Sequence, residues 1–242
     1  MQGNDQQAYD RGTSLFSPDG RIYQVEYARE AVKRGGASVG VRTAHGVVFA
    51  AQARARSDLM ETRSIEKLHK FDDHVGGASA GHVADARQLI DFARQRSQVN
   101  QLRFGEPIGV ETLAKEITDH IQESTQVGGT RPYGAALLIG GVDGDQPRLF
   151  ETDPSGTPHE WAAVAIGGGH DEIRSFLEDN YADDLELEAG IDLALEALLQ
   201  DEALSAEEIS LATITAEDGY RTYSAEEIAD ELEPIDVDRD EE

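Results

Sequence analysis

The residues whose pattern could bind a charged ligand are three consecutive glycines at 167–169, followed by His170. A glycine-rich turn that opens a helix can bind phosphate, because the first amides of the helix point at the anion. Here the spacing differs from the dinucleotide-binding fingerprint, no P-loop Lys follows, and Asp171 and Glu172 would repel phosphate. The pattern favours a structural turn, with a nucleotide-binding enzyme as an alternative.

The residue types that commonly bind metals show no typical spacing. The chain contains no cysteine, which excludes disulfides and thiol chemistry. Its histidines are isolated or flank acids in an arrangement unlike the His-Glu-x-x-His motif. We therefore expect no metal and no other cofactor.

Acidic residues dominate the charge of this chain of 242 residues, with 48 Asp and Glu against 21 Lys and Arg and a net charge of −27. The acids are spread along the whole chain, which favours adaptation to a salty cytoplasm over a single acidic binding surface, because molar salt screens charges beyond about 3 Å. Nucleic-acid binding is not expected, since it requires a basic face. We expect neither a signal peptide nor a membrane span, and a cytoplasmic location.

Hairpins and pairs of helices alternate along the chain. Hairpins are predicted at residues 37–52, 135–152 and 210–223, with further strands near 74–79 and 161–166. Apolar residues at helical spacing predict helices around residues 21–33, 86–93, 110–121, 173–177, 191–199 and 228–232. Hairpins give antiparallel strands and grouped helices give covering layers, so the predicted fold class is α+β.

The segment from Tyr9 to Val32 joins a polar arm, a turn and an amphipathic helix. Pro18-Asp19-Gly20 has turn chemistry, and Ile22, Val25 and Val32 lie on one face of the helix that follows. The whole segment reads YDRGTSLFSPDGRIYQVEYAREAV. It resembles the N-terminal signature of α subunits of the proteasome core particle (20S).

Later segments resemble the same family in the same order. They include SIEKL at 64–68, SAG at 79–81, VADAR at 83–87, GGTRPYG at 128–134 and DPSG at 153–156. The chain is thus similar to archaeal, and specifically haloarchaeal, α subunits over about residues 5–232. The resemblance implies a four-layer α-β-β-α sandwich of two antiparallel sheets, the N-terminal-nucleophile hydrolase fold.

The proteolytic β subunits of this family attack peptides with an N-terminal Thr, whose own amine is the base. The matching position here is near Gly36, with Ala37 and Ser38 after it, so that Thr is missing. The β-subunit carboxylate is matched by Gln52, and a catalytic Lys by Lys67. The resemblance therefore implies a non-catalytic subunit. An active hydrolase of the same fold, with Ser38 as nucleophile, is the alternative.

The resemblance also implies a gate at the centre of a ring of α subunits. In the family, the residues before the first helix block entry, and Tyr9, Asp10, Pro18 and Tyr27 match a cluster that braces the open gate. A Tyr hydroxyl beside an Asp carboxylate can make a strong charge-assisted hydrogen bond. This gate would control the entry of unfolded protein substrates.

Two further sites are implied by the resemblance. Lys67, Arg29 and Gly81 match a pocket between neighbouring α subunits, where an AAA-type ATPase regulatory ring inserts its C-terminal tails. An ammonium suits a terminal carboxylate as a point charge. A pore-constriction loop is matched by Gly128, Gly129 and Arg131.

The expected organisation is a mobile gate arm at 1–12, one domain at 13–232 that includes the helix at 21–33, and a disordered acidic tail at 233–242. The expected partners are other α subunits in a heptameric ring and the β subunits, whose ring assembly the α ring would template.

Overall fold

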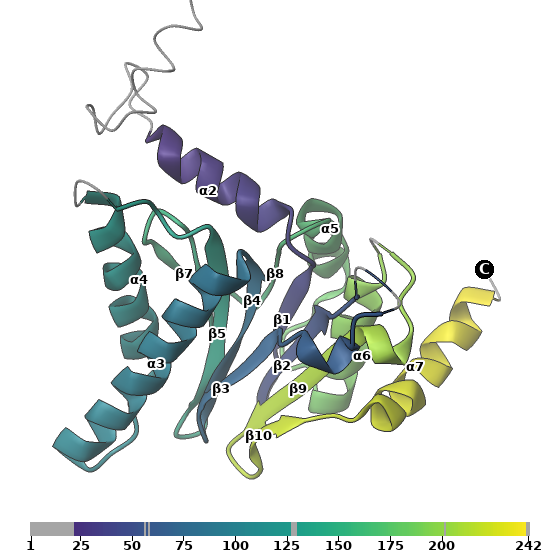
Figure 1. The fold of residues 1–242 in the computed structure, drawn as a ribbon. Coiled ribbons are helices and arrows are strands. Elements are labelled where there is room, and N and C mark those ends of the chain that lie inside the picture. Colours follow the sequence, from purple (N-terminus) through teal and green to yellow (C-terminus); the bar gives the residue numbers. More distant parts are fainter. Residues whose placement is uncertain (1–21, 56, 58, 127–129, 201, 241–242) are drawn as a thin grey trace, which may run out of the picture.

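Two five-stranded antiparallel sheets, stacked face to face, form the centre of the computed structural model, which describes residues 22–55, 57, 59–126, 130–200 and 202–240 (Figure 1). The first sheet has the order β10-β9-β2-β1-β8 and the second the order β3-β4-β5-β6-β7. The strands of the first are β1 (Ser38–Arg42), β2 (Gly46–Gln52), β8 (Ala163–Ile166), β9 (Ile209–Thr215) and β10 (Gly219–Thr222). Those of the second are β3 (Leu68–Asp72), β4 (Val75–Gly81), β5 (Ala135–Asp143), β6 (Gln146–Thr152) and β7 (Pro158–Glu160).

Helices cover the outer face of each sheet, as Figure 1 shows. The second sheet is covered by α3 (Val83–Phe104) and α4 (Val110–Gln126), and the first by α5 (His170–Asn180), α6 (Leu187–Leu198) and α7 (Ala225–Asp240). A further helix, α2 (Tyr23–Lys33), lies across one end of the sandwich and packs against β4 and β5. Single 3₁₀ turns occur at Thr62–Ser64 and Ala206–Glu208. The four-layer sandwich predicted from the family resemblance is thereby confirmed.

The core between the sheets is apolar and closely packed. Phe49, Leu138 and Leu149 are fully buried there. A methyl group added at Gly140 would lie 2.7 Å from the Phe49 ring, so a glycine at this position lets the two sheets approach. Each sheet makes a second apolar layer with its own helices, which is why the central strands β2 and β5 are almost continuously hydrophobic.

Sequence periodicity missed two strands. β3 carries only two apolar residues in LHKFD, and β7 is the largely exposed tripeptide at 158–160. β7 pairs with β6 through the backbone at the edge of its sheet, so its sequence carries little hydrophobic pattern.

The C-terminal helix is longer than predicted. α7 continues to Asp240, in place of the disordered tail expected from Glu233 onward. Ile228, Leu232 and Ile235 follow one another at helical spacing and are all buried against α6 and the first sheet, so the apolar face extends past Glu233. The tail prediction is corrected for residues 233–240, and residues 241–242 and the arm at 1–12 lie outside the described residues.

None of the helices within the described ranges is both long and apolar enough to cross a membrane.

Candidate functional site

The segment between α2 and β1 is tightly packed at the end of the sandwich. Gly35 O accepts a hydrogen bond of 2.8 Å from Gly168 N. A Cβ at Gly35 would lie 2.4 Å from the backbone nitrogen of Gly81, so only glycine fits there. The link (residues 34–37, here called the linker) therefore runs between the end of β4 and the glycine turn at 167–169.

The glycine turn itself has a structural role. Gly167 has φ +97° and Gly169 has φ +60°, values that favour glycine. The amide of Gly168 is used by the linker, and His170 Nδ1 lies 3.0 Å from Gly167 O. The turn thus holds the linker with an amide that a phosphate site would need, which supports the structural interpretation.

Lys67 points its amine at the linker. Its Nζ donates a hydrogen bond of 3.1 Å to Gly36 O. Within the described residues, Lys67 forms no ion pair, and neither Glu66 nor Asp72 binds it. Burial lowers the pKa of Lys67 to about 8. This lysine is therefore a partly buried cation that the described part of its own chain does not neutralise.

The positions that match the catalytic residues of β subunits do come together. Gln52 Oε1 accepts a hydrogen bond of 3.3 Å from Ala37 N and would lie 3.1 Å from a Cβ at Gly36. Gly36 has no side chain, and its nitrogen is in a peptide bond with Gly35. The site offers an ammonium and an amide, without a hydroxyl or a free amine at position 36.

Ser38, the alternative nucleophile, is fully buried in β1. Its hydroxyl donates a hydrogen bond of 3.0 Å to Ser79 O. The nearby imidazole of His69 contacts the Ser79 hydroxyl at 3.1 Å instead. Burial, with the charges of Arg94 and Lys67, lowers the pKa of His69 to about 4. Neither geometry nor basicity prepares Ser38 to attack a peptide.

Arg29 forms an ion pair with Asp153, a distant residue that the sequence did not indicate as its partner. Its Nε and Nη2 donate to the two oxygens of Asp153 at 2.9 and 3.0 Å, and its Nη1 donates to Glu26 at 2.6 Å. Burial would raise the pKa of Asp153, but the bonds from Arg29 and Ser155 hold it below its usual value. The structure thus brings Lys67 and Gly81 to the linker, whereas Arg29 is bound to Asp153.

Arg131 is held by a buried carboxylate. Its guanidinium donates to Asp85 at 2.6 and 2.8 Å, and Gly134 N donates to the same carboxylate at 2.8 Å. The Asp85 side chain is 5% exposed and that of Arg131 65%. Burial would raise the pKa of Asp85, but Arg131 and the Gly134 amide hold it below its usual value. This pair joins the start of α3 to the segment before β5.

The comparison with known families agrees with this geometry. Residues 32–214 match the family model described as proteasome subunit, and residues 9–31 match the model of the N-terminal signature of A-type proteasome subunits. The chain belongs to the proteasome subunit family.

Similar proteins are proteasome α subunits of halophilic archaea. The chain is 62% identical to the proteasome alpha subunit of Natronomonas pharaonis, over 98% of this chain and 95% of the relative. It is 63% identical to proteasome alpha subunit 1 of Haloferax volcanii, over 98% and 96%, and 61% identical to the proteasome alpha subunit of Halobacterium salinarum, over 97% and 94%. With the A-type signature, they identify a non-catalytic proteasome α subunit, in agreement with the prediction from the sequence.

The remaining predicted sites are only partly described. Tyr27 lies on α2 and is 45% exposed. Tyr9, Asp10 and Pro18 of the predicted gate, and Gly128 and Gly129 of the predicted pore loop, lie outside the described residues. The gate and pore assignments remain predictions.

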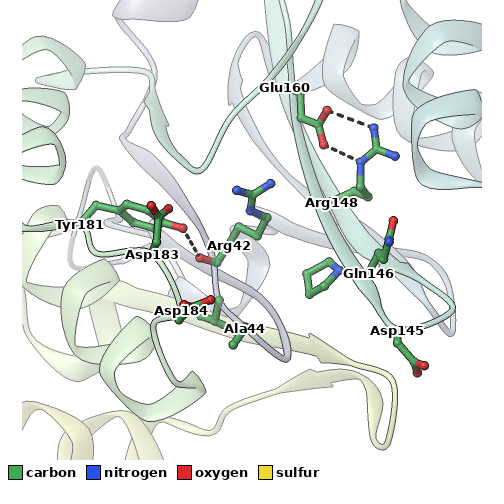
Figure 2. Close-up of a pocket in the computed structure, with 11 residues that line it drawn as sticks. Arg42, Ala44, Asp145, Gln146, Arg148, Glu160, Tyr181, Asp183 and Asp184 are labelled. Carbon is green, nitrogen blue, oxygen red and sulfur yellow. Dashed lines mark hydrogen bonds and ion pairs between the residues drawn. The ribbon is translucent and has the colours of Figure 1, made fainter.

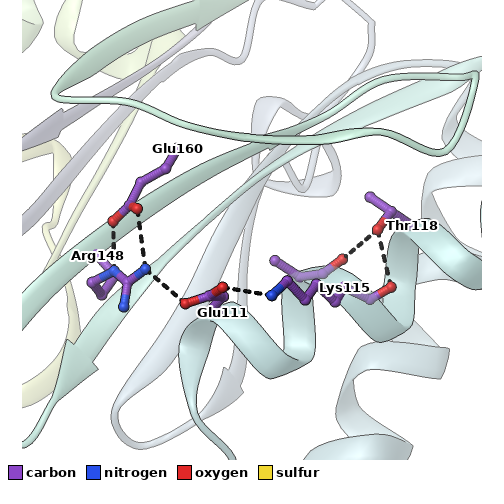
Figure 3. Close-up of polar contacts among 6 residues, drawn as sticks. Glu111, Lys115, Thr118, Arg148 and Glu160 are labelled. Atoms are coloured by element: carbon purple, nitrogen blue, oxygen red, sulfur yellow. Dashed lines mark hydrogen bonds and ion pairs between the residues drawn. The ribbon is translucent and has the colours of Figure 1, made fainter.

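A pocket of about 510 Å³ lies at the opposite end of β1 from the linker (Figure 2). Tyr181 donates a hydrogen bond of 3.2 Å to Arg42 O at its wall, and Arg148 is turned toward Glu160. Arg148 also donates a hydrogen bond of 3.0 Å to Glu111, and Figure 3 shows this contact. The bonds of Arg148 to Glu111 and Glu160 connect α4 with β6 and β7. They are separate from the linker site.

Proposed function

We propose that this α subunit forms the outer ring of the core particle in the cytoplasm, controls the entry of unfolded proteins with residues 1–12, and binds the C-terminal tails of an AAA-type ATPase ring at Lys67. Its partners in this proposal are six further α subunits in a heptameric ring, as the family resemblance implies, and the β subunits, whose assembly it templates.

The observation that supports tail binding is the isolated ammonium of Lys67. In a chain with 48 acidic residues, Lys70 and Lys115 are bound by carboxylates at 2.5 and 2.6 Å. Among the described residues, Lys67 has only the carbonyl of Gly36 as a partner. A terminal carboxylate that arrives from another molecule would meet a cation already partly desolvated, where a charge-assisted hydrogen bond is strong.

Loss of the Lys67 cation tests this docking function. We expect Lys67→Ala rings to lose binding to the AAA-type ATPase ring in co-sedimentation in molar KCl, while ring size stays unchanged. Lys70→Ala is the matched control, because that lysine is paired with Asp73 and should be dispensable for docking. Docking that persists in Lys67→Ala would remove the assignment.

The gating function has its own test. Deletion of residues 2–12 should speed the degradation of an unfolded protein such as casein by the assembled particle, because the arm no longer obstructs entry. Hydrolysis of a short fluorogenic peptide in parallel reports whether the β subunits are intact. Unchanged casein degradation would refute gating by this arm.

The lack of peptidase activity is also part of the proposal. It is supported by the absence of a side chain at Gly36 and by the peptide bond that occupies its nitrogen. We expect the isolated chain not to cleave fluorogenic peptides. Cleavage that disappears on Ser38→Ala would instead favour the active hydrolase.

A further inference from the structure

Arg42, the last residue of β1, is a partly buried arginine whose guanidinium has no partner among the described residues. Most arginine side chains that the structure describes pair with a carboxylate: Arg29, Arg54, Arg94, Arg96, Arg131, Arg148, Arg174 and Arg221. The others without a pair, Arg34, Arg87 and Arg103, are exposed to water. Within this described set, Arg42 alone gives up part of its hydration without a carboxylate in return, which favours an incoming anion.

The side chain of Arg42 projects into the pocket of about 510 Å³ at this end of β1, as Figure 2 shows. Its backbone is fixed on both sides, because Arg42 N donates to Ala162 O at 2.8 Å and Arg42 O accepts from the Tyr181 hydroxyl at 3.2 Å. The volume is typical of small-molecule sites. The walls come from the end of β1 and the turn to β2, the start of β6, β7, and the segment between α5 and α6.

The other charged groups of the pocket leave this guanidinium unneutralised. The Arg148 guanidinium is already bound to Glu160 and Glu111 at 3.0 Å each. Asp183 and Asp184 line the pocket in the segment between α5 and α6, and neither forms an ion pair within the described chain. A free guanidinium and two free carboxylates therefore border the same space without neutralising one another.

We propose that this pocket binds a small zwitterion, a molecule with one carboxylate and one ammonium group, such as a short peptide with free termini. Arg42 would hold the carboxylate, whose two oxygens match the guanidinium fork, and Asp183 and Asp184 would hold the ammonium. A simple anion would be repelled by the two aspartates and a simple cation by Arg42, so a ligand with both charges is favoured. Asp145 also lines the pocket, but Figure 2 shows its carboxylate turned away from Arg42.

Short peptides arise from the proteolysis that the proteasome family carries out. Hydrolysis of a peptide bond leaves a carboxylate on one fragment and an amine, largely protonated at neutral pH, on the other. Each fragment thus has the two groups that the pocket would bind, and a single amino acid has them at a shorter separation. The inference does not rest on docking at Lys67, because the pocket lies at the opposite end of β1 from the linker.

The test is saturation-transfer difference NMR on the full, assembled chain in molar KCl, with triglycine as the peptide and glycine as the single amino acid. Triglycine amide lacks the carboxylate and N-acetyltriglycine lacks the ammonium, so each analogue keeps one of the two charges. We expect triglycine to bind at least about tenfold more tightly than either analogue, because each has lost one charge-assisted contact. The corresponding analogues of glycine test the amino acid in the same way.

The outcomes separate the possible ligands. Tighter binding of triglycine than of glycine assigns the site to peptides, and the reverse order assigns it to amino acids. N-acetyltriglycine that binds as well as triglycine would show a site for anions only and would overturn the proposal. Saturable binding of neither zwitterion would also overturn it.

Variants place the ligand in this pocket. Arg42→Gln removes the guanidinium, and Asp183→Asn with Asp184→Asn removes the carboxylates, since Asn tolerates the φ of +64° at Asp184. Each change should weaken triglycine binding at least about tenfold, whereas Arg87→Gln, which removes an exposed and unpaired arginine of α3, should leave it unchanged.

Triglycine binding that persists in a folded Arg42→Gln chain would place the ligand elsewhere and overturn the assignment. Circular dichroism reports whether that variant folds. If it does not, Arg42→Lys keeps the charge without the fork and should still bind triglycine more weakly than the unaltered chain. Equal binding by a folded Arg42→Lys chain and the unaltered chain would then refute the role of the guanidinium.

Discussion

Replacement of Lys67 by Met tests the electrostatic description of this residue. Its pKa is lowered from 10.5 to about 8 by burial. Below pH 8 the amine is protonated in both the folded and the unfolded chain, so the folded state bears the full cost of burying the charge. That cost is about 3.4 kcal/mol, at ~1.36 kcal/mol for each pH unit between the two values.

Met is unbranched and uncharged, and it loses only the hydrogen bond to Gly36 O, which contributes about 1 kcal/mol. We therefore expect Lys67→Met to raise the free energy of unfolding at pH 7 by about 2 kcal/mol. As the pH rises above 8, the folded chain releases the Lys67 proton while the unfolded chain keeps it up to 10.5. The wild type gains stability over this interval, so the advantage of Met should shrink by about 2 kcal/mol between pH 7 and pH 9.5.

The assay is urea denaturation in molar KCl, followed by the fluorescence of Trp161, the single tryptophan. Both proteins are compared at one concentration and in the same assembly state. Lys70→Met is the control, because it removes a half-exposed lysine and a surface ion pair that molar salt screens, so its free energy of unfolding should change little. A Lys67→Met variant that is less stable at pH 7, or a difference that does not change with pH, would refute the reasoning.

Three further predictions concern other parts of the fold. Arg131→Ala should lower the free energy of unfolding by about 2–3 kcal/mol at pH 7, because it leaves the buried carboxylate of Asp85 without its cation. Asp85→Asn should lower it by only about 1 kcal/mol, because water can solvate the remaining guanidinium of Arg131. Urea denaturation measures both values. Gly35→Ala should lower the free energy of unfolding by at least about 2 kcal/mol, measured in the same way, because its Cβ would collide with the nitrogen of Gly81. Asp192→Asn should raise Tm by about 2 °C at low salt and have less effect in molar KCl, because burial and a neighbouring acid raise the pKa of Asp192 and disfavour its charged form; thermal denaturation at two salt concentrations tests this.

Each of these predictions has a result that would contradict it. A higher cost for Asp85→Asn than for Arg131→Ala would reverse the assignment of the buried charge. A Gly35→Ala variant as stable as Gly105→Ala would argue against the tightly packed linker, since a Cβ at Gly105 meets no atom within 4 Å and is opposed only by the positive φ of that residue. An effect of Asp192→Asn that grows with salt would exclude charge repulsion as its cause.

The sequence predicts the elements whose side chains are buried on a regular period. Leu137 to Ile139 and Leu113 to Ile121 are examples, because burial on a sheet or helix face imposes a pattern that can be counted. The hydrophobic period does not reveal β3 and β7, because much of each strand is exposed. Their pairing depends on backbone groups, which every sequence has. α7 was predicted too short because its acids concealed the buried Ile235.

The site is only partly readable from the sequence. Family resemblance predicts Lys67 and Arg131 as site residues, but their surroundings depend on the fold. Asp85 lies 46 residues from Arg131, and Asp153 lies 124 residues from Arg29. The isolation of Lys67 was equally hidden, because acids adjacent to it in sequence make no ion pair with it in the structure.

The linker makes it difficult for this chain to acquire β-type catalysis. A Thr placed at position 36 would carry a hydroxyl, but its nitrogen would be an amide and therefore no base. Cleavage before position 36 would free that nitrogen, yet it would also detach α2, whose Val25, Ala28 and Val32 are buried against the end of the sandwich. A single substitution at position 36 therefore does not supply both the hydroxyl and the free amine that a β-type site needs. A ring that contains such chains is thus protected against acquiring proteolytic activity at this position by accident.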